Sequence, residues 1–449
     1  MRRYPDPEGW LVSERWSLAA GLRKAARGHH RVLCVVDDAG RLVGSLSSGD
    51  VYRAVDRSGG RLEDVTVREV MHARPMAAFV WESPSLVQTL MRPGVDMIPL
   101  VSSTEEVVAV VTDESPQLEL GARSVGPGNP CLVVAEVGNN HQGDVQVAVD
   151  LAEACVEAGA DAVKFQLRTG IADADRSRDL GTEYVDDLLR RFNLTTDQMH
   201  EVLSGCQSRG ITAFCTPWDS AALRFLVEEG VAAIKIASAD LTNNELVAQA
   251  VETVLPLIIS TGMSTEDEIG RALAPLREKW VQYALLHTNS TYPAMPSQIN
   301  LRYMDRLRIL GSGIVGYSSH DLGLDISLAA VARGANIIEK HVTFDKTQEG
   351  NDHRVSLLPT ELKELVTSIR RVEESLGSDG PRSVSQGEVL NRQTLAKSLV
   401  WNSSRQAGAL VDSSAIRTVS GAGGMTPDRL QGLVGRRLTR GVLKDAPVS

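Results

Sequence analysis

The sequence lacks any apolar segment of membrane-spanning length. No apolar run approaches the roughly 20 residues that a helix needs to cross a bilayer. The first residues, MRRYPDPEGWLVSERW, also lack the apolar core of a secretory signal peptide. We therefore expect a cytoplasmic protein with no membrane partner.

The cysteines lack the spacing of a disulfide framework or a zinc site. There are five, an odd number, and no two are arranged as C-x-x-C. In a protein expected to be cytoplasmic, this pattern predicts reduced thiols. They are Cys34, Cys131, Cys155, Cys206 and Cys215.

Basic residues are in the minority. The chain has 47 Lys and Arg residues against 57 Asp and Glu residues, so its formal net charge is −10. Affinity for nucleic acids comes mainly from neutralising phosphates with cationic side chains. A nucleic-acid partner is therefore not expected.

Two stretches rich in Gly, Pro and Ser divide the 449 residues into three domains. We predict linkers at 116–130 and 377–388, and hence domains at 1–115, 131–376 and 389–449. The first domain contains an internal repeat, because RVLCVVDDAGRLVGSLSSGDVYRAV and VDMIPLVSSTEEVVAVVTDES each offer a strand, a polar turn and a second strand.

The middle domain alternates strands with amphipathic helices eight times. Eight such units in about 245 residues match a (β/α)8 TIM barrel. The rival fold is a doubly wound open sheet, but EVGNNHQGD is a poor match to the Gly-rich loop that usually follows its first strand. The expected strands cover 131–137, 161–167, 211–217, 232–238, 256–262, 282–288, 313–319 and 335–341.

Strand alternation predicts two lysines inside this barrel. Lys164 and Gln166 share the face of their strand opposite Val163 and Phe165, and Lys235 lies opposite its isoleucine neighbours. Two buried ammonium groups repel each other unless internal glutamates neutralise them or an anionic substrate joins them. Both alternatives are open from the residues alone. Hydroxyls at other strand ends are candidate donors to such an anion or, alternatively, helix N-caps: Thr216, Ser238, Ser260, Ser290 and Ser318.

The segment IIEKH places Glu339 and His341 on the interior face and Lys340 on the outer face. His320 ends the preceding strand, so the two imidazoles are expected to lie close together. Two histidines and a carboxylate suit a divalent metal with open positions, although a single histidine there would more often be structural.

Further polar residues follow the strand ends. Glu136 ends the first strand and Asp352 follows the last, and either is a candidate acid or base, or a ligand for a substrate hydroxyl. His141 and His353 fall in expected loops, where they could be ordinary surface residues.

Several segments of the middle domain closely resemble the sialic acid synthase family, phosphoenolpyruvate-dependent synthases of nine-carbon 2-keto-3-deoxy acids. They are AEVGNNHQGDVQVAVDLAEACVEAGADAVKFQ, STGMST, HTNSTYPAMP, GYSSHDLG and IEKHVTFDKTQEGNDH. The resemblance implies a TIM barrel followed by a small antifreeze-like (SAF) domain, which TVSGAGGMTPDRLQGLVGRRLTRGV resembles more weakly.

The same resemblance implies roles for individual residues. His320 and His341 would bind Mn²⁺ or Mg²⁺. Phosphoenolpyruvate would be held by Lys164, Thr216, Lys235, Ser238, Ser260, Ser290 and Ser318. The sugar would be surrounded by Glu136, Gln166, Asp240, Tyr292, Glu339 and Asp352, of which Glu136, Glu339, Asp352 and Tyr292 are the catalytic candidates. A homodimer is implied, in which the C-terminal domain of one subunit reaches the barrel of the other.

Three departures from the family pattern surround the expected sugar. Position 240 is Asp where the family often has Glu, and a loop Asn common in the family has no counterpart in DADRSRDLGTEYVDD. The family's antifreeze-like domain also supplies an Arg that aligns here with Ser420, while Arg417 lies one turn upstream. We therefore expect an altered acceptor sugar, unless Arg417 substitutes.

The N-terminal domain resembles a tandem CBS pair, a module that generally binds adenosyl ligands. Asp50 matches the acidic residue that holds ribose hydroxyls, and the second half, ending VTDES, has no Asp at that place. A purely structural or dimerising module is the alternative. For the whole chain, the competing functions are a metal-dependent aldolase or isomerase on the same barrel and a nucleotide-sensing protein with a degenerate barrel.

Overall fold

The computed structural model describes residues 1–28, 30–58, 61–169, 191–378 and 380–449. The chain forms two compact units, Met1–Leu376 and Gly377–Ser449. The first unit holds the N-terminal module and the barrel, and the second unit is described separately below. Among the described residues, no helix is both long enough and apolar enough to span a bilayer.

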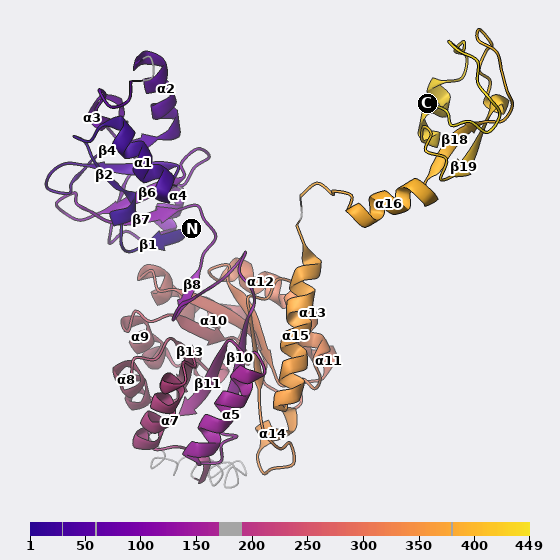
Figure 1. Cartoon of the computed structure of the whole chain (residues 1–449). Coiled ribbons are helices and arrows are strands. Elements are labelled where there is room, and N and C mark those ends of the chain that lie inside the picture. The colour runs from indigo at the N-terminus through magenta and orange to yellow at the C-terminus, as the bar shows by residue number, and fades with distance from the viewer. Residues whose placement is uncertain (29, 59–60, 170–190, 379) are drawn as a thin grey trace. The chain divides into compact units, whose positions relative to one another are not determined.

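Eight parallel strands close into a barrel, and each neighbouring pair follows the order of the chain. This confirms the predicted TIM-barrel fold. Figure 1 shows the helices on the outside of the strands, with α5 beside β10 and β11. The strands are β10 (Leu132–Gly138), β11 (Ala162–Leu167), β12 (Ala213–Pro217), β13 (Ile234–Ile236), β14 (Leu257–Ser260), β15 (Tyr283–Asn289), β16 (Val315–Ser319) and β17 (Ile337–His341).

The barrel helices begin at residues suited to their N-termini. Asp144 caps α5 by accepting hydrogen bonds from Gln146 and Val147, and Thr195 and Thr265 form capping boxes. None of the strand-end hydroxyls at 216, 238, 260, 290 and 318 caps a described helix. The helices are α5 (Val145–Glu157), α7 (Thr196–Ser208), α8 (Ser220–Glu228), α9 (Asn244–Glu252), α10 (Glu266–Glu278), α11 (Pro296–Ile299), α12 (Tyr303–Leu310), α13 (Asp325–Ala332), α14 (Asn351–Val355) and α15 (Pro359–Leu376).

The stretch predicted as a linker at 116–130 contains a β-hairpin. Strands β8 (Leu118–Leu120) and β9 (Arg123–Val125) pair in antiparallel fashion. Leu118, Leu120 and Val125 are buried against apolar residues inside the barrel, such as Phe214 and Ile258. The Gly- and Pro-rich composition of this stretch predicted a linker. Its three buried apolar side chains instead close the end of the barrel where the strands begin.

The N-terminal module contains two antiparallel strand pairs, as the internal repeat predicted: β3 with β4 and β6 with β7. Its elements are β1 (Arg2–Tyr4), η1 (Glu8–Trp10), β2 (Leu11–Ser13), α1 (Leu18–Gly28), β3 (Val32–Val36), β4 (Leu42–Ser47), α2 (Ser48–Ser58), α3 (Val67–Val70), β5 (Ala78–Phe79), α4 (Pro84–Leu90), β6 (Met97–Val101) and β7 (Val107–Thr112). The strands form two sheets, β1-β7-β6-β5 and β2-β3-β4.

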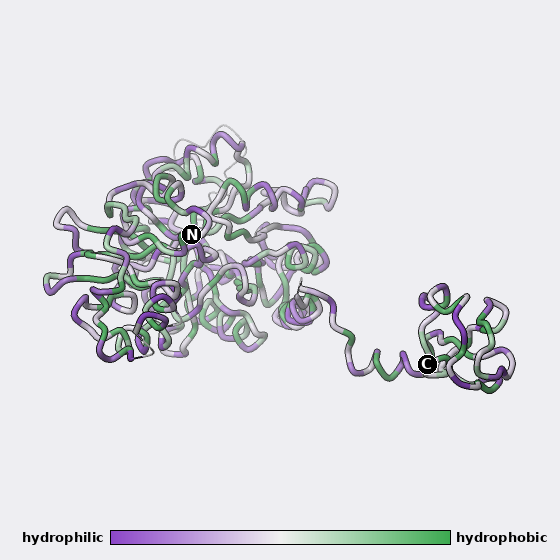
Figure 2. Tube along the Cα trace, turned by 90° about the horizontal axis from the view of Figure 1, so that it is seen from above, coloured by the Kyte–Doolittle hydropathy of each residue, from purple (hydrophilic) through white to green (hydrophobic). Residues whose placement is uncertain are grey.

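The C-terminal unit has a small core of its own, and Figure 2 shows hydrophobic stretches in it. Leu399, Trp401 and Ile416 are buried there. Its elements are α16 (Gln386–Leu395), β18 (Lys397–Trp401), η4 (Ser413–Ala415), β19 (Ile416–Ser420) and η5 (Pro427–Gly432). Helix α16 therefore begins inside the stretch predicted as the second linker.

Candidate active site

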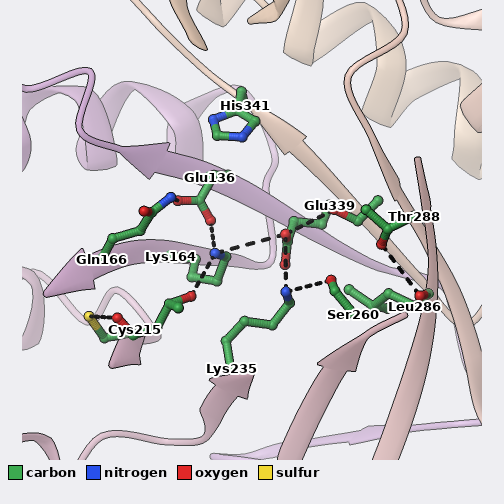
Figure 3. Close-up of polar contacts among 12 residues, drawn as sticks. Glu136, Lys164, Gln166, Cys215, Lys235, Ser260, Leu286, Thr288, Glu339 and His341 are labelled. Atoms are coloured by element: carbon green, nitrogen blue, oxygen red, sulfur yellow. Dashed lines mark hydrogen bonds and ion pairs between the residues drawn. The ribbon is translucent and has the colours of Figure 1, made fainter. Parts of the chain in front are cut away.

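Two lysines and two glutamates meet inside the barrel near the carboxyl ends of its strands (Figure 3). All four side chains are buried. Lys164 pairs with Glu136, the residue opposite it on the neighbouring strand, and lies 3.8 Å from Glu339. Lys235 lies 3.7 Å from the same oxygen of Glu339. Both lysines thus point inward as predicted, and of the two open alternatives the structure shows neutralisation by internal glutamates.

Burial and pairing shift the ionisation of this cluster in opposite directions. Burial raises the pKa of Glu136 to about 7 and lowers the pKa of Lys235 to about 8. Burial also opposes ionisation of Glu339, yet the ammonium groups of Lys164 and Lys235 outweigh it and lower the pKa of that carboxyl. Glu339 is therefore the fixed anion of the cluster, whereas Glu136 can gain a proton near neutral pH.

Hydroxyl groups extend the cluster around the barrel. Lys164 donates a hydrogen bond of 3.0 Å to Thr216, and Lys235 donates one of 2.7 Å to Ser260. Ser318 donates to Glu339 over 3.0 Å. Each of these three hydroxyls thus contacts a member of the charged cluster, as a shared anion site requires.

Ser238 and Ser290 come together around Gly262, a residue that strand reasoning did not single out. The backbone N–H of Gly262 donates to the Ser238 hydroxyl over 3.2 Å. A Cβ at position 262 would lie 2.8 Å from that oxygen and closer still to the hydroxyl of Ser290. Gly262 therefore keeps open the space between the two hydroxyls, and its only signal in the sequence was its place in STGMST.

His320 and His341 lie close together, with ring centroids 5.4 Å apart. Burial lowers the pKa of His320 to about 4 and that of His341 to about 3, so both imidazoles are neutral, the form that binds metals. His320 Nδ1 faces the Asn289 carbonyl at 3.0 Å. His341 Nδ1 is buried and has no hydrogen-bond partner among the described residues.

The carboxylate of Asp352 lies 3.9 Å from His341 Nδ1. Within the described residues, no three His, Cys, Asp or Glu side chains are arranged closely enough to hold an ion by themselves. Two neutral imidazoles, one with an orphaned buried nitrogen, fit a divalent metal that takes its remaining ligands from water or substrate.

Two other predicted residues, Tyr292 and Gln166, lie at the same mouth of the barrel. The Tyr292 ring stacks on His320 with centroids 3.7 Å apart. Gln166 donates to Glu136 over 3.2 Å and accepts from the Trp218 indole over 3.1 Å. Trp218 was missed because it follows the strand, outside the period-2 pattern.

Asp240 keeps one carboxylate oxygen buried without a partner among the described residues. Its other oxygen accepts from Asn243 over 3.1 Å. Burial raises the pKa of this carboxyl. An unsatisfied buried oxygen at the mouth of the barrel is suited to accept a hydrogen bond from a ligand hydroxyl.

The expectation that His141 and His353 could be surface residues is wrong. Both are buried. His141 Nδ1 accepts from the Gly143 backbone over 3.0 Å, and His353 Nδ1 lies 2.7 Å from the Thr343 hydroxyl. These bonds fix the loops after β10 and β17.

The remaining candidates lie elsewhere. Asp50 is at the start of α2 in the N-terminal module, where it accepts from the Ser47 backbone over 2.8 Å and pairs with Arg53. In the C-terminal unit, Ser420 accepts from Lys397, and Arg417 pairs with Asp445. The segment DADRSRDLGTEYVDD lies outside the described residues.

Comparison with known proteins gives two family matches and several similar proteins. Residues 151–380 match the NeuB family, and residues 10–57 match the CBS domain. An N,N'-diacetyllegionaminic acid synthase of Legionella pneumophila is 33% identical over 335 residues, which cover 71% of this chain and 93% of the relative. The human N-acetylneuraminate-9-phosphate synthase is 32% identical, with coverages of 73% and 94%.

A solved structure agrees with these matches. The crystal structure of an N-acetylneuraminic acid (sialic acid) synthetase from Leptospira borgpetersenii, in complex with citrate, superposes with a TM-score of 0.58 at 33% sequence identity. The alignment covers 63% of this chain and 98% of that protein.

Proposed function

This chain belongs to the NeuB family, and we propose that it is a transferase that condenses phosphoenolpyruvate with an aldose to give a 2-keto-3-deoxy sugar acid and phosphate. One observation carries the proposal: paired inward lysines and strand-end hydroxyls share a barrel mouth with two neutral imidazoles. An anionic co-substrate and a sugar aldehyde can therefore meet there.

Phosphoenolpyruvate would enter the space around Lys235, Ser260 and Gly262. The ammonium group of Lys235 and the hydroxyls beside Gly262 offer donors to phosphate oxygens. Glu136 and Glu339 already offset the lysine charges, so an incoming anion competes with them. Because the pKa of Glu136 is raised to about 7, this carboxyl can take a proton when the anion binds and relieve the repulsion.

His320 and His341 would hold Mn²⁺ or Mg²⁺, with Asp352 nearby. When bound, such an ion supplies polarisation of the aldehyde carbonyl. Chelation should abolish condensation, and Mn²⁺ should restore it. Metal content gives an independent readout: His341→Ala should retain less than a stoichiometric amount of Mn²⁺ after dialysis. Stoichiometric Mn²⁺ in that variant, or full activity without metal, would contradict the assignment.

In the condensation, C3 of the enolpyruvate forms a bond with the aldehyde carbon, and the aldehyde oxygen takes a proton. We assign that proton to the carboxyl group of Glu136, which Gln166 orients through its amide. Water then adds to C2 and returns a proton to Glu136. The C2 hydroxyl that came from this water then passes its proton to the departing phosphate as the bond between C2 and the bridging oxygen breaks, which leaves the 2-keto group and HPO4²⁻. A buried carboxyl whose pKa lies near 7 is suited to both transfers.

The test is phosphate release from phosphoenolpyruvate, measured with Mn²⁺ against a panel of mannosamine-type and other aldoses. We expect release that depends on the acceptor. Lys235→Met should weaken phosphoenolpyruvate binding by roughly 2–5 kcal/mol, the usual loss when one partner of a buried charge pair is removed. Release that is absent with every aldose, or independent of the aldose, would contradict the proposal.

The acceptor is proposed to differ from N-acetylmannosamine. Asp240 has a shorter reach than the Glu common in the family, and Ser420 stands where an Arg is common. The two relatives, one named for a legionaminic acid and one for a neuraminate phosphate, are 33% and 32% identical to this chain, so overall identity does not choose the sugar. A kcat/KM for N-acetylmannosamine at or above about 10⁴ M⁻¹s⁻¹ would refute the altered acceptor. Loss of that efficiency in Arg417→Ala would show that Arg417 substitutes.

For the two flanking parts we propose accessory roles. The C-terminal unit would act as an antifreeze-like domain that reaches the barrel of a second subunit in a homodimer. The CBS module would bind an adenosyl ligand near Asp50, although Ser47 and Arg53 already engage that carboxylate. Calorimetry should detect binding of an adenosine nucleotide to the parent protein and no binding to the Asp50→Ala variant. If no adenosine nucleotide gave a heat of binding, the module would be assigned a structural role.

A further inference from the structure

A second cavity lies far from the barrel mouth, between the N-terminal module and the start of the barrel strands. Its volume is about 620 Å³, within the range of small-molecule sites. The barrel contributes Tyr283 at the beginning of β15 and Ile314 just before β16. The candidate active site lies at the other ends of these strands, so the two sites are distinct.

The charged side chains that line this cavity are three arginines: Arg2, Arg3 and Arg277. None of the described residues lining it is Asp or Glu. Glutamines 88, 117 and 282 add further polar groups. The chain as a whole has a net charge of −10, yet the charged side chains that line this cavity are all cationic.

These arginines are only partly compensated. Arg2 pairs with Glu119 over 3.0 Å. Arg3 stacks 5.8 Å from the Trp280 ring, and its Nε is buried without a hydrogen-bond partner among the described residues. The Arg277 guanidinium donates to the Leu310 carbonyl, and within the described residues neither Arg3 nor Arg277 forms an ion pair. Burial lowers the pKa of Arg3, which reflects the cost of holding this charge away from water.

The cavity wall also joins the two parts of the first unit. The Trp280 indole, on the barrel side, donates to the Glu82 carbonyl of the module over 3.3 Å. A ligand beside Arg3 and Arg277 would therefore contact both the module and the barrel at once.

We propose that this cavity binds a small oxyanion, the phosphate or carboxylate group of a metabolite. The guanidinium group presents a planar fork of donors that matches either oxyanion. An oxyanion beside Arg3 and Arg277 would offset the excess positive charge of the lining. This site is independent of the function proposed above, because it uses no residue of the barrel mouth.

The experiment titrates the full chain with pyrophosphate and, in a separate arm, with citrate. Calorimetry measures binding, and tryptophan fluorescence reports on Trp280. Saturable binding of pyrophosphate alone would identify a phosphate site, binding of citrate alone would identify a carboxylate site, and both would support the shared chemistry. Arg3→Met and Arg277→Met should each weaken binding roughly tenfold or more, as the loss of a charged hydrogen-bond donor predicts.

Three controls make the result specific. Arg57→Met removes the same charge from an exposed position on α2 and should leave binding unchanged. Lys235→Met disables the anion site in the barrel mouth and should also leave it unchanged, and Trp280→Phe should remove the fluorescence response. Equal melting temperatures of the arginine variants would show that folding is preserved. The Trp280 response separates this cavity from the anion site in the barrel mouth. No saturable Trp280 response to either anion, a response that survives Arg3→Met with Arg277→Met, or a response lost in Lys235→Met would overturn the proposal.

Discussion

At the scale of single residues, the ability of Lys235 to bind an anion in the barrel mouth depends on whether its side chain is charged. Lys235 is buried beside one carboxylate, and burial lowers its pKa to about 8. Below that pH the side chain is a cation that can pair with phosphate, and above it the side chain is neutral. The affinity of the site for an anion is therefore expected to be greatest below about pH 8.

We predict that kcat/KM for phosphoenolpyruvate falls as pH rises through about 8. This ratio reports groups that ionise in the free enzyme, so the lowered pKa of Lys235 should appear directly. Lys235→Arg keeps its charge at all accessible pH values and should remove this limb of the profile, even at a lower absolute rate. An unchanged alkaline limb in Lys235→Arg would assign it to another group.

Gly262→Ala should weaken phosphoenolpyruvate without unfolding the barrel. The new methyl group would occupy the space between the hydroxyls of Ser238 and Ser290, which can rotate away but then no longer face a ligand. We expect KM for phosphoenolpyruvate to rise roughly tenfold, the value of about one hydrogen bond to a charged group.

A matched control exists for this substitution. Gly270 lies in α10, and a Cβ there would have no neighbour within 4 Å. Gly270→Ala should leave KM unchanged and stabilise the helix by up to about 1 kcal/mol. If both alanine variants had the KM of the parent, Gly262 would have no part in the anion site.

Residue positions were predictable from sequence where strand alternation controls them. The inward direction of Lys164, Lys235 and Glu339 followed from the period of two. The partners of these charges did not follow, because the pairing of Lys164 with Glu136 depends on the register between β10 and β11. The role of Gly262 could not be predicted either. This residue acts by leaving space where another residue would have a Cβ, and strand alternation does not reveal such a space.

At the scale of elements, β17 shows how one strand serves both faces of the barrel wall. Glu339 joins the interior cluster, while Lys340 points the other way and is fully buried. Its ammonium group lies 2.8 Å from the Asp321 carbonyl and 3.1 Å from the carboxylate of the same residue, which also accepts from Tyr317 over 2.7 Å. This outer ion pair fixes the segment that follows His320.

Lys340→Met should therefore destabilise the first unit by about 3–5 kcal/mol, because it leaves the Asp321 carboxylate buried and unpaired. Adding Asp321→Asn should recover part of that loss. Lys346→Met removes a half-exposed pair with Glu361 and should cost less than about 1 kcal/mol. Urea denaturation followed by circular dichroism measures all three, and equal midpoints for Lys340→Met and Lys346→Met would contradict this account of β17.

At the scale of the whole molecule, the architecture of the barrel was readable because eight similar units repeat along the sequence. The hairpin β8–β9 could not be predicted from the sequence, because its apolar residues are few and lie among turn-forming residues. The two units have separate cores. The residues proposed to hold phosphoenolpyruvate and the metal all lie in the first of these units.

The central claim is that the barrel joins phosphoenolpyruvate to an aldose by C–O cleavage. It is tested most directly with phosphoenolpyruvate carrying ¹⁸O in the bridging oxygen, incubated with Mn²⁺ and the acceptor that gives the fastest phosphate release. Mass spectrometry of the released phosphate and of the sugar acid locates the label. We predict that the label is found in phosphate and that a 2-keto-3-deoxy acid forms in equal amount. Phosphate without label, from P–O cleavage, or release without a new sugar acid would contradict the account.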